Sequence, residues 1–234
     1  VAELSGEMYF HWQLELLPRL GRIWQAAIQR WPKLRLWHNG GESPYVRESL
    51  RRLGITSNQL VPACDHLQAT TLLVPSFAAH FGRSSTANLQ WLEQFWATPE
   101  QPGQNSVWLG REGAARRAVL EETQHRQTCC VGLPGHGSVS EQLHQVAASH
   151  RVISPHGAAM ANLIAAHPGT EILELVNPAY QPVYFNDLIK HRQLRHRRLE
   201  AATTPLPLQE LLYEGPLSFP IDLRPGASPA AEAL

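Results

Sequence analysis

The sequence predicts an α/β fold built around a parallel sheet. Short apolar runs alternate with amphipathic helical stretches along most of the 234 residues. The clearest unit is 152–176, which reads as a strand, a tight loop, a short helix and a second strand. A polar, Pro- and Gly-rich stretch at 98–105 divides the pattern, so we expect two halves, residues 1–100 and 101–234.

Composition excludes several classes of function. The chain has 20 Lys plus Arg and 20 Asp plus Glu, and its isoelectric point is about 7.3. It therefore has no overall positive charge that would favour nucleic acid as a partner. No apolar run has transmembrane length, and no signal peptide is recognisable. The three cysteines form neither a disulfide framework nor a Cys-x-x-Cys metal pair, which favours a reducing, cytoplasmic setting.

The first expected element is an amphipathic helical stretch at 6–31, in which Pro18 predicts a kink or a break. His11 and Glu15 lie four residues apart in its first piece and therefore share a helix face. They are either a general base and the carboxylate that orients it, or an ordinary contact that stabilises the helix. Spacing alone leaves both interpretations open. The HExxH zinc motif is excluded because its second histidine is absent.

Strands and helices are expected to alternate up to the divide. Short apolar runs predict three strands, at 34–37, 60–62 and 70–74. Ser43-Pro44 opens a helix that Gly54 closes, and a second helix is expected at 87–96. The first half is therefore also predicted to be α/β.

The second half repeats this alternation. The pattern predicts a strand at 107–109, helices at 114–125 and 138–148, and the strands and helix of 152–176. Ligands of such sheets collect at the carboxyl ends of the strands. Arg111, His156 and Glu174 are all predicted to lie there, which makes these strand ends the candidate ligand site.

The loop in 152–176 has the features of a phosphate site. Pro155 ends the strand, and His156-Gly157-Ala158 turns the chain into a helix. Small residues let a ligand approach the main chain, and the helix N-terminus offers unpaired N–H groups and a positive dipole. A short His-Gly turn without any ligand is the common alternative.

Three further side chains complete the candidate site. Glu174 is a lone carboxylate in an apolar strand and needs a partner such as a ribose hydroxyl. Arg111 could grip a diphosphate with its planar guanidinium, and Arg116 could add charge. An arginine at a strand end is also commonly solvated or paired with a surface carboxylate, so its sequence position leaves both roles open.

Several of these motifs follow one another in a set order. They are Tyr9-Phe10-His11-Trp12 with Glu15-Leu16-Leu17-Pro18-Arg19-Leu20, Leu73-Val74-Pro75-Ser76, Trp108-Leu109-Gly110-Arg111 with Ala115-Arg116-Arg117 and Glu121, Pro155-His156-Gly157-Ala158 to Asn162, and Pro168-Gly169-Thr170 to Glu174. As a set they resemble glycosyltransferase family 61, over most of residues 5–190. Bacterial members of that family occur mainly in polysaccharide gene clusters.

The resemblance implies a GT-B architecture with two Rossmann-like halves and the nucleotide-sugar donor on the second. The stretch that precedes Tyr9 in the family is largely absent, so we expect the first half to be incomplete and the chain to be N-terminally reduced or a fragment. The implied donor-binding residues are Arg111, Arg116, His156, Gly157, Ala158, Asn162 and Glu174.

The expected function is transfer of a hexose or pentose, with inversion, from a nucleotide sugar to a hydroxyl of a glycan or similar acceptor. The donor is expected to be UDP-linked. His11 oriented by Glu15 is the candidate base, with Glu15 itself as the alternative. No cofactor or metal is expected, because the chain has no Asp-x-Asp among its aspartates, Asp65, Asp187 and Asp222.

Two other functions compete with this one. The first is a degenerate, catalytically weak module that binds a nucleotide sugar. The second is an NAD-dependent oxidoreductase, which ranks last because no G-x-G-x-x-G follows a strand.

Overall fold

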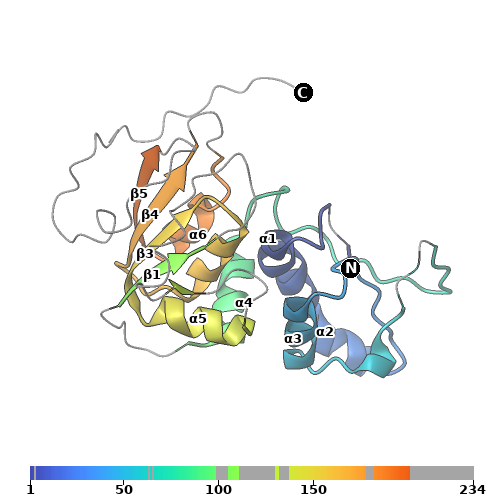
Figure 1. Ribbon diagram of the computed structural model, residues 1–234. Helices are drawn as coiled ribbons and strands as arrows, with labels where there is room; N and C mark the ends of the chain where they lie inside the picture. The colour runs from blue at the N-terminus through green and yellow to red at the C-terminus, as the bar shows by residue number, and fades with distance from the viewer. Residues whose placement is uncertain are drawn as a thin grey trace, which may run out of the picture.

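The structure is a computed structural model that describes residues 1–2, 4–62, 64, 66–98, 105–110, 130–131, 137–177 and 182–200. A helical N-terminal part lies beside a part that contains the sheet (Figure 1). Both contribute to one hydrophobic core, which includes Trp12 and Leu16 from the first part and Val152 and Met160 from the second. The mixed α/β class predicted from the sequence is confirmed.

The N-terminal helical stretch is one continuous run of three segments, in which a π-helix lies between two α-helices. It consists of α1 (Tyr9–His11), the π-helix η1 (Trp12–Leu16) and α2 (Leu17–Arg30). Pro18 lies in the first turn of α2, where its missing N–H does least harm, and the wider π turn comes directly before it. The predicted kink or break is therefore a change of helical pitch, and α2 continues past it.

Two further helices flank α2. They are α3 (Pro44–Arg52) and α4 (Thr86–Trp96), with the short 3-10 helix η2 (Ser57–Gln59) between them. Gly54 follows α3 with a φ of +76°, as the sequence predicts for a helix-ending glycine. Gly21 of α2 lets α4 approach closely, since an added Cβ would lie 1.9 Å from the ring of Trp91.

The strands expected in the first half form only in part. Leu36 and Leu60 make an isolated parallel bridge, with N–H to carbonyl distances of 2.6 and 2.8 Å on either side of it. Residues 70–74 form no strand within the described part of the chain, and Leu72 and Val74 are 70% and 71% exposed. A strand requires a hydrogen-bonded neighbour, and the described residues place none beside this segment.

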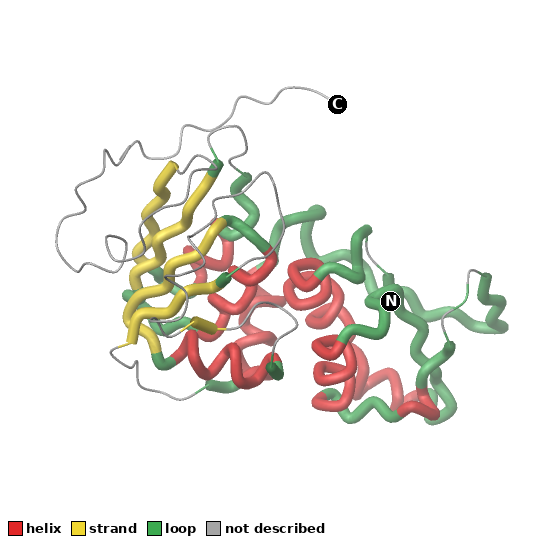
Figure 2. The backbone as a smooth tube through the Cα atoms, in the orientation of Figure 1, coloured by secondary structure: helices red, strands yellow, loops and turns green. Residues whose placement is uncertain are grey.

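The second half contains a five-stranded sheet, drawn in yellow in Figure 2. Its neighbouring strands are all parallel. Its strands are β1 (Asn105–Leu109), β2 (Cys130–Val131), β3 (Ser149–Pro155), β4 (Glu171–Val176) and β5 (Arg195–Glu200), in the order β2-β1-β3-β4-β5. The predicted parallel sheet is confirmed. The polar sequence of β5 gave no strand signal.

Helices α5 (Val139–Ala147), η4 (Ala158–Ala165) and α6 (Asn186–His191) connect these strands. The 3-10 helix η4 contacts α1, α4, α5 and α6, so it lies where the helical part meets the sheet-containing part. The predicted helix at 114–125 is outside the described residues. Within the described part of the chain, no helix has both the length and the apolar character needed to span a membrane.

Candidate active site

The strand order reverses between β1 and β3, so their carboxyl ends are where a ligand crevice is expected. In the order β2-β1-β3-β4-β5 the sheet grows in one direction from β1 to β2 and in the other from β3 onward. Open parallel sheets bind ligands in the crevice outside the carboxyl ends at such a reversal. Gly110 follows β1, and His156-Gly157 follows β3. The predicted loop therefore lies at the switch point of the sheet.

The loop is held by main-chain contacts on both sides. The N–H of His156 donates to the carbonyl of Leu175 over 2.8 Å, and the N–H of Met160 donates to the carbonyl of Gly157 over 3.0 Å. Gly157 precedes the first turn of η4 in extended backbone, and Ala158 begins η4 and is partly exposed. The strand, loop and helix follow one another as the sequence predicts.

Glu174 of β4 is the centre of a charged cluster. Its side chain is fully buried, and its Oε1 lies 2.5 Å from His156 Nδ1. Its Oε2 lies 2.7 Å from His196 Nε2 and accepts from Arg198 Nε over 2.9 Å. Burial alone raises a carboxyl pKa, but the two histidine hydrogen bonds and the Arg198 charge outweigh it and hold the pKa of Glu174 well below its usual value. The carboxylate thus has protein partners without a ribose hydroxyl.

Asn162 connects η4 to the N-terminal helix. Its Oδ1 accepts a short hydrogen bond from the hydroxyl of Tyr9, and its Nδ2 donates to Gln142 Oε1 over 3.0 Å. Burial raises the pKa of Tyr9, so its phenol stays protonated and remains a donor. The amide of Asn162 is thus engaged within the protein, and its contacts place α1 against η4.

The second pair of interest is His11 and Glu15, which do make the predicted contact. His11 Nδ1 lies 2.7 Å from Glu15 Oε2, and Glu15 Oε1 accepts from the N–H of Gly82 over 2.7 Å. The ring of Phe81 stacks on the imidazole at 4.5 Å. A carboxylate at Nδ1 favours the tautomer that has its lone pair on Nε2, and no described residue bonds to that Nε2. The imidazole is therefore arranged to accept a proton.

Aromatic rings join the two histidine–glutamate pairs. Phe10 lies 5.0 Å from the ring of His11 and 5.3 Å from Phe185. Phe185 in turn lies 5.3 Å from the ring of His156, and Tyr184 lies 6.1 Å from it. The structure therefore brings His11, Glu15, His156 and Glu174 into one region, although they come from distant parts of the sequence.

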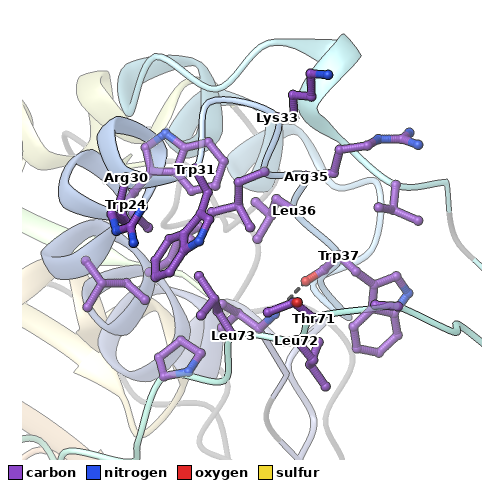
Figure 3. Close-up of a pocket in the computed structure, with 18 of the residues that line it drawn as sticks. Trp24, Arg30, Trp31, Lys33, Arg35, Leu36, Trp37, Thr71, Leu72 and Leu73 are labelled. Carbon is purple, nitrogen blue, oxygen red and sulfur yellow. Dashed lines mark hydrogen bonds between the residues drawn. The ribbon is translucent and has the colours of Figure 1, made fainter.

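A separate cavity of about 760 Å³ lies in the N-terminal part. Its lining includes the indoles of Trp24, Trp31 and Trp37, with Lys33 and Arg35 at its edge (Figure 3). None of the residues of the two histidine–glutamate pairs lines it. The candidate active site, at the carboxyl ends of the strands, therefore does not include this cavity.

Some site residues were not found from the sequence, and others are not described by the structure. Arg111 and Arg116 lie outside the described residues, so their predicted contact with a diphosphate stays a prediction. His196 and Arg198 were missed because β5 was not expected. Their spacing of two residues would have put both side chains on one face of a strand.

Comparison with known proteins gives two matches. The sequence profile of Glycosyltransferase 61 matches residues 9–173, which includes His11, Glu15, His156 and Asn162. A relative from Oryza sativa subsp. japonica, Beta-1,2-xylosyltransferase RCN11, is 31% identical over 103 residues, which is 42% of this chain and 19% of the relative. The matched region is thus about a fifth of that relative's length. Because the profile matches well over half of the chain, the protein belongs to glycosyltransferase family 61.

Proposed function

We propose that the protein is an inverting glycosyltransferase that moves a sugar from a UDP-linked donor to a hydroxyl of a glycan or similar acceptor. The observation that carries this proposal is that the rings of Phe10 and Phe185 link two histidine–glutamate pairs, one in the N-terminal helix and one at the loop after β3. One pair is arranged to take a proton, and the other supports the loop expected to hold phosphate. Direct displacement with a leaving diphosphate needs both capabilities.

The donor is proposed to occupy the crevice outside β1 and β3. We propose that the first N–H groups of η4 and its dipole meet the diphosphate there, and that Arg111 and Arg116 supply guanidinium groups to it. Glu174 acts through His156, because its oxygens already accept from three side chains. The site is proposed to work without a metal, within a GT-B architecture whose acceptor side is the N-terminal part.

The proposed chemistry is a single displacement. His11 Nε2 takes the proton of the acceptor hydroxyl, and the hydroxyl oxygen attacks the anomeric carbon of the donor. The bond between that carbon and the diphosphate oxygen breaks on the opposite face, so the configuration inverts. Glu15 stabilises the imidazolium that forms, and it holds the ring in the tautomer that exposes Nε2.

The choice of donor sugar comes from the matched relative. Its name describes transfer of xylose, so UDP-xylose is the first donor that we propose for this chain. No local sequence motif separates a pentose from a hexose donor, because contacts to the exocyclic groups of the sugar determine that choice.

Binding and turnover can be measured separately. A ligand at a hundred times its dissociation constant stabilises the folded state by about 2.7 kcal/mol, which a thermal-shift screen of UDP, UDP-xylose and other nucleotide sugars detects. We expect a shift with at least one uridine nucleotide, followed by slow release of UDP from the matching donor. A shift without UDP release in the presence of acceptors would favour the nucleotide-sugar-binding module. No shift with any uridine, guanosine or cytidine nucleotide would contradict the proposal.

A further inference from the structure

A loop of the N-terminal part contacts both members of the His11–Glu15 pair. Phe81 stacks on the imidazole with an interplanar angle of 17°, and the N–H of Gly82 donates to the second carboxylate oxygen. Gly82 is buried, has a φ of +74°, and has the ring of Tyr184 2.9 Å from where a Cβ would be. The loop therefore has a conformation that glycine adopts readily and other residues do not.

The same loop is bound to the sheet-containing part. Nε and Nη2 of Arg83 donate to the two oxygens of Asp187, each over 2.7 Å, and the N–H of Ser84 donates to Asp187 Oδ2 over 3.3 Å. Asp187 lies in the first turn of α6, and the hydrogen bond from Arg83 lowers its pKa. The two aromatic residues at 184–185 contact His156. Residues 184–187 thus contact the loop at 81–84 and the donor-side histidine together.

We infer that Gly82, Arg83 and Asp187 are positioning residues for the general base. Their contacts make the geometry of the His11–Glu15 pair depend on the packing of the N-terminal part against α6. A bidentate arginine–carboxylate pair fixes direction as well as distance. Displacement of a catalytic group by about 1 Å can cost roughly 100-fold in rate. The inference rests on the proposed function, because it assigns these residues a role in the same reaction.

The contact with Gly82 also sets the charge that faces His11. If the Gly82 N–H no longer donates to Glu15, the negative charge of the carboxylate is less neutralised, and the imidazolium form of His11 becomes more stable. A general base works deprotonated, so the acidic limb of the pH–rate profile should move to higher pH. Arg19, His80 and Arg83 line the small cavity beside Glu15, and all three are unchanged in Gly82→Ala, the variant whose pH profile is the test. A shift of the limb thus reports on the loop.

The test measures UDP release from UDP-xylose by the full chain for Gly82→Ala, Arg83→Ala and Asp187→Asn. We expect turnover to fall at least about tenfold while KM for the donor stays within about twofold, because the donor contacts are intact. The acidic limb of Gly82→Ala should move to higher pH. The exchange of Arg83→Asp with Asp187→Arg should restore part of the turnover that either single change loses.

Two matched controls separate positioning from general strain. Gly54 has a φ of +76° and no atom within 4 Å of an added Cβ, so Gly54→Ala has comparable backbone strain without touching the site. Arg47 pairs with Glu42 at 3.8 Å, and both side chains are exposed, so Arg47→Ala removes an ion pair that involves neither histidine–glutamate pair. Turnover in both controls should equal that of the unmodified protein.

Turnover and an acidic limb equal to the controls in all three variants would overturn the inference. His11→Ala, measured in the same assay, distinguishes that failure from failure of the proposed function. If His11→Ala keeps its turnover, His11 is not the general base and the proposed function fails. If His11→Ala loses its turnover while the three variants do not, only the positioning role fails. Should Gly82→Ala not fold, Arg83→Ala decides, since the Arg83 side chain is half exposed. If UDP release is too slow to measure, the pH at which the His11 ring NMR signals titrate decides in its place: higher in Gly82→Ala supports the inference, and unchanged overturns it.

Discussion

The two histidine–glutamate pairs share one contact but differ in their surroundings. In each, an imidazole Nδ1 meets a carboxylate oxygen, over 2.7 Å at His11–Glu15 and 2.5 Å at His156–Glu174. The second oxygen of Glu15 accepts from a neutral main-chain N–H, whereas that of Glu174 meets a histidine and an arginine. One carboxylate has a single imidazole to stabilise, and the other is part of a larger charged cluster.

Because of this difference, we expect the His11 imidazole to gain and lose a proton during the reaction, and the Glu174 carboxylate to keep its charge. The Glu15 carboxylate directs its charge mainly at one imidazole, so it can stabilise the imidazolium when a proton arrives. Glu174 remains ionised, since its pKa is lowered by its two histidines and the Arg198 charge despite its burial. We therefore expect the first pair to affect turnover and the second to affect stability and donor binding.

The largest expected effect is on turnover at the first pair. His11→Ala should reduce turnover by about 10² to 10⁴ with little change in donor affinity, because the proton acceptor is removed and the donor contacts remain. Glu15→Gln should reduce turnover less, because it changes the orientation and charge of the imidazole without deleting it. Initial rates of UDP release and the KM for the donor measure both.

The reverse order would make the carboxylate the base and the histidine its partner. If both variants keep near-normal turnover, the pair is only a helix contact, worth roughly 0.3 to 0.5 kcal/mol. In that case neither histidine–glutamate pair would have a role in proton transfer, and the proposed functional difference between them would be wrong.

The next effect is on stability at the second pair. Glu174→Gln leaves Arg198, His196 and His156 facing a neutral amide in a buried cluster, which should lower the free energy of unfolding by about 3 to 5 kcal/mol at neutral pH. Urea denaturation followed by far-UV circular dichroism measures it. Glu42→Gln, in an exposed ion pair, is the control and should change stability by less than about 1 kcal/mol.

The pH dependence of this loss has a definite sign. The pKa of Glu174 is lowered on folding, so its contribution is complete above the usual carboxyl value of 4.5 and is lost as pH falls through the lowered pKa. The difference between the unmodified protein and Glu174→Gln should therefore shrink below about pH 4.5. A difference that is independent of pH would assign the loss to packing.

The sequence predicts this site unevenly, for physical reasons. The contact between His11 and Glu15 could be predicted because i,i+4 spacing is local. The loop at His156 could be predicted because Pro and Gly determine local backbone. The partners of Glu174 could not, because the parallel register that puts Arg198 opposite Glu174 is a property of the assembled sheet.

The same reasoning applies to the fold. The spacing of apolar residues and the positions of the glycines predicted β3, β4 and α3, for which the local sequence pattern and the tertiary packing agree. They failed for β5, whose sequence RHRRLE is polar, and for 70–74, which is apolar but has no neighbouring strand among the described residues. Strand formation depends on a partner, and a partner is not encoded locally.

A smaller effect is expected at Arg111, on donor affinity. If its guanidinium holds the diphosphate, Arg111→Ala should weaken donor binding by about 1.5 to 3 kcal/mol, and Arg111→Lys should recover only part of it, because an ammonium cannot make the bidentate contact. Isothermal titration with UDP measures both. Arg47→Ala, which also removes one arginine side chain, is the control. Equal UDP affinity in a folded Arg111→Ala protein would remove this arginine from the site.

The smallest expected effect is that of metal removal, which should leave UDP binding and UDP release unchanged. A divalent cation at a diphosphate needs carboxylate oxygens, and the carboxylate beside the donor loop, Glu174, already accepts from two histidines and an arginine. Asp187 is likewise bound to Arg83 through both oxygens. In the proposed mechanism, arginines and main-chain N–H groups meet the charge on the leaving diphosphate. The measurement is UDP release after dialysis against EDTA, compared with the same sample supplied with manganese. Loss of release in EDTA, restored by manganese, would show that acidic ligands outside the described residues complete a metal site, and that the donor side of the comparison depends on a metal rather than on fixed protein charge.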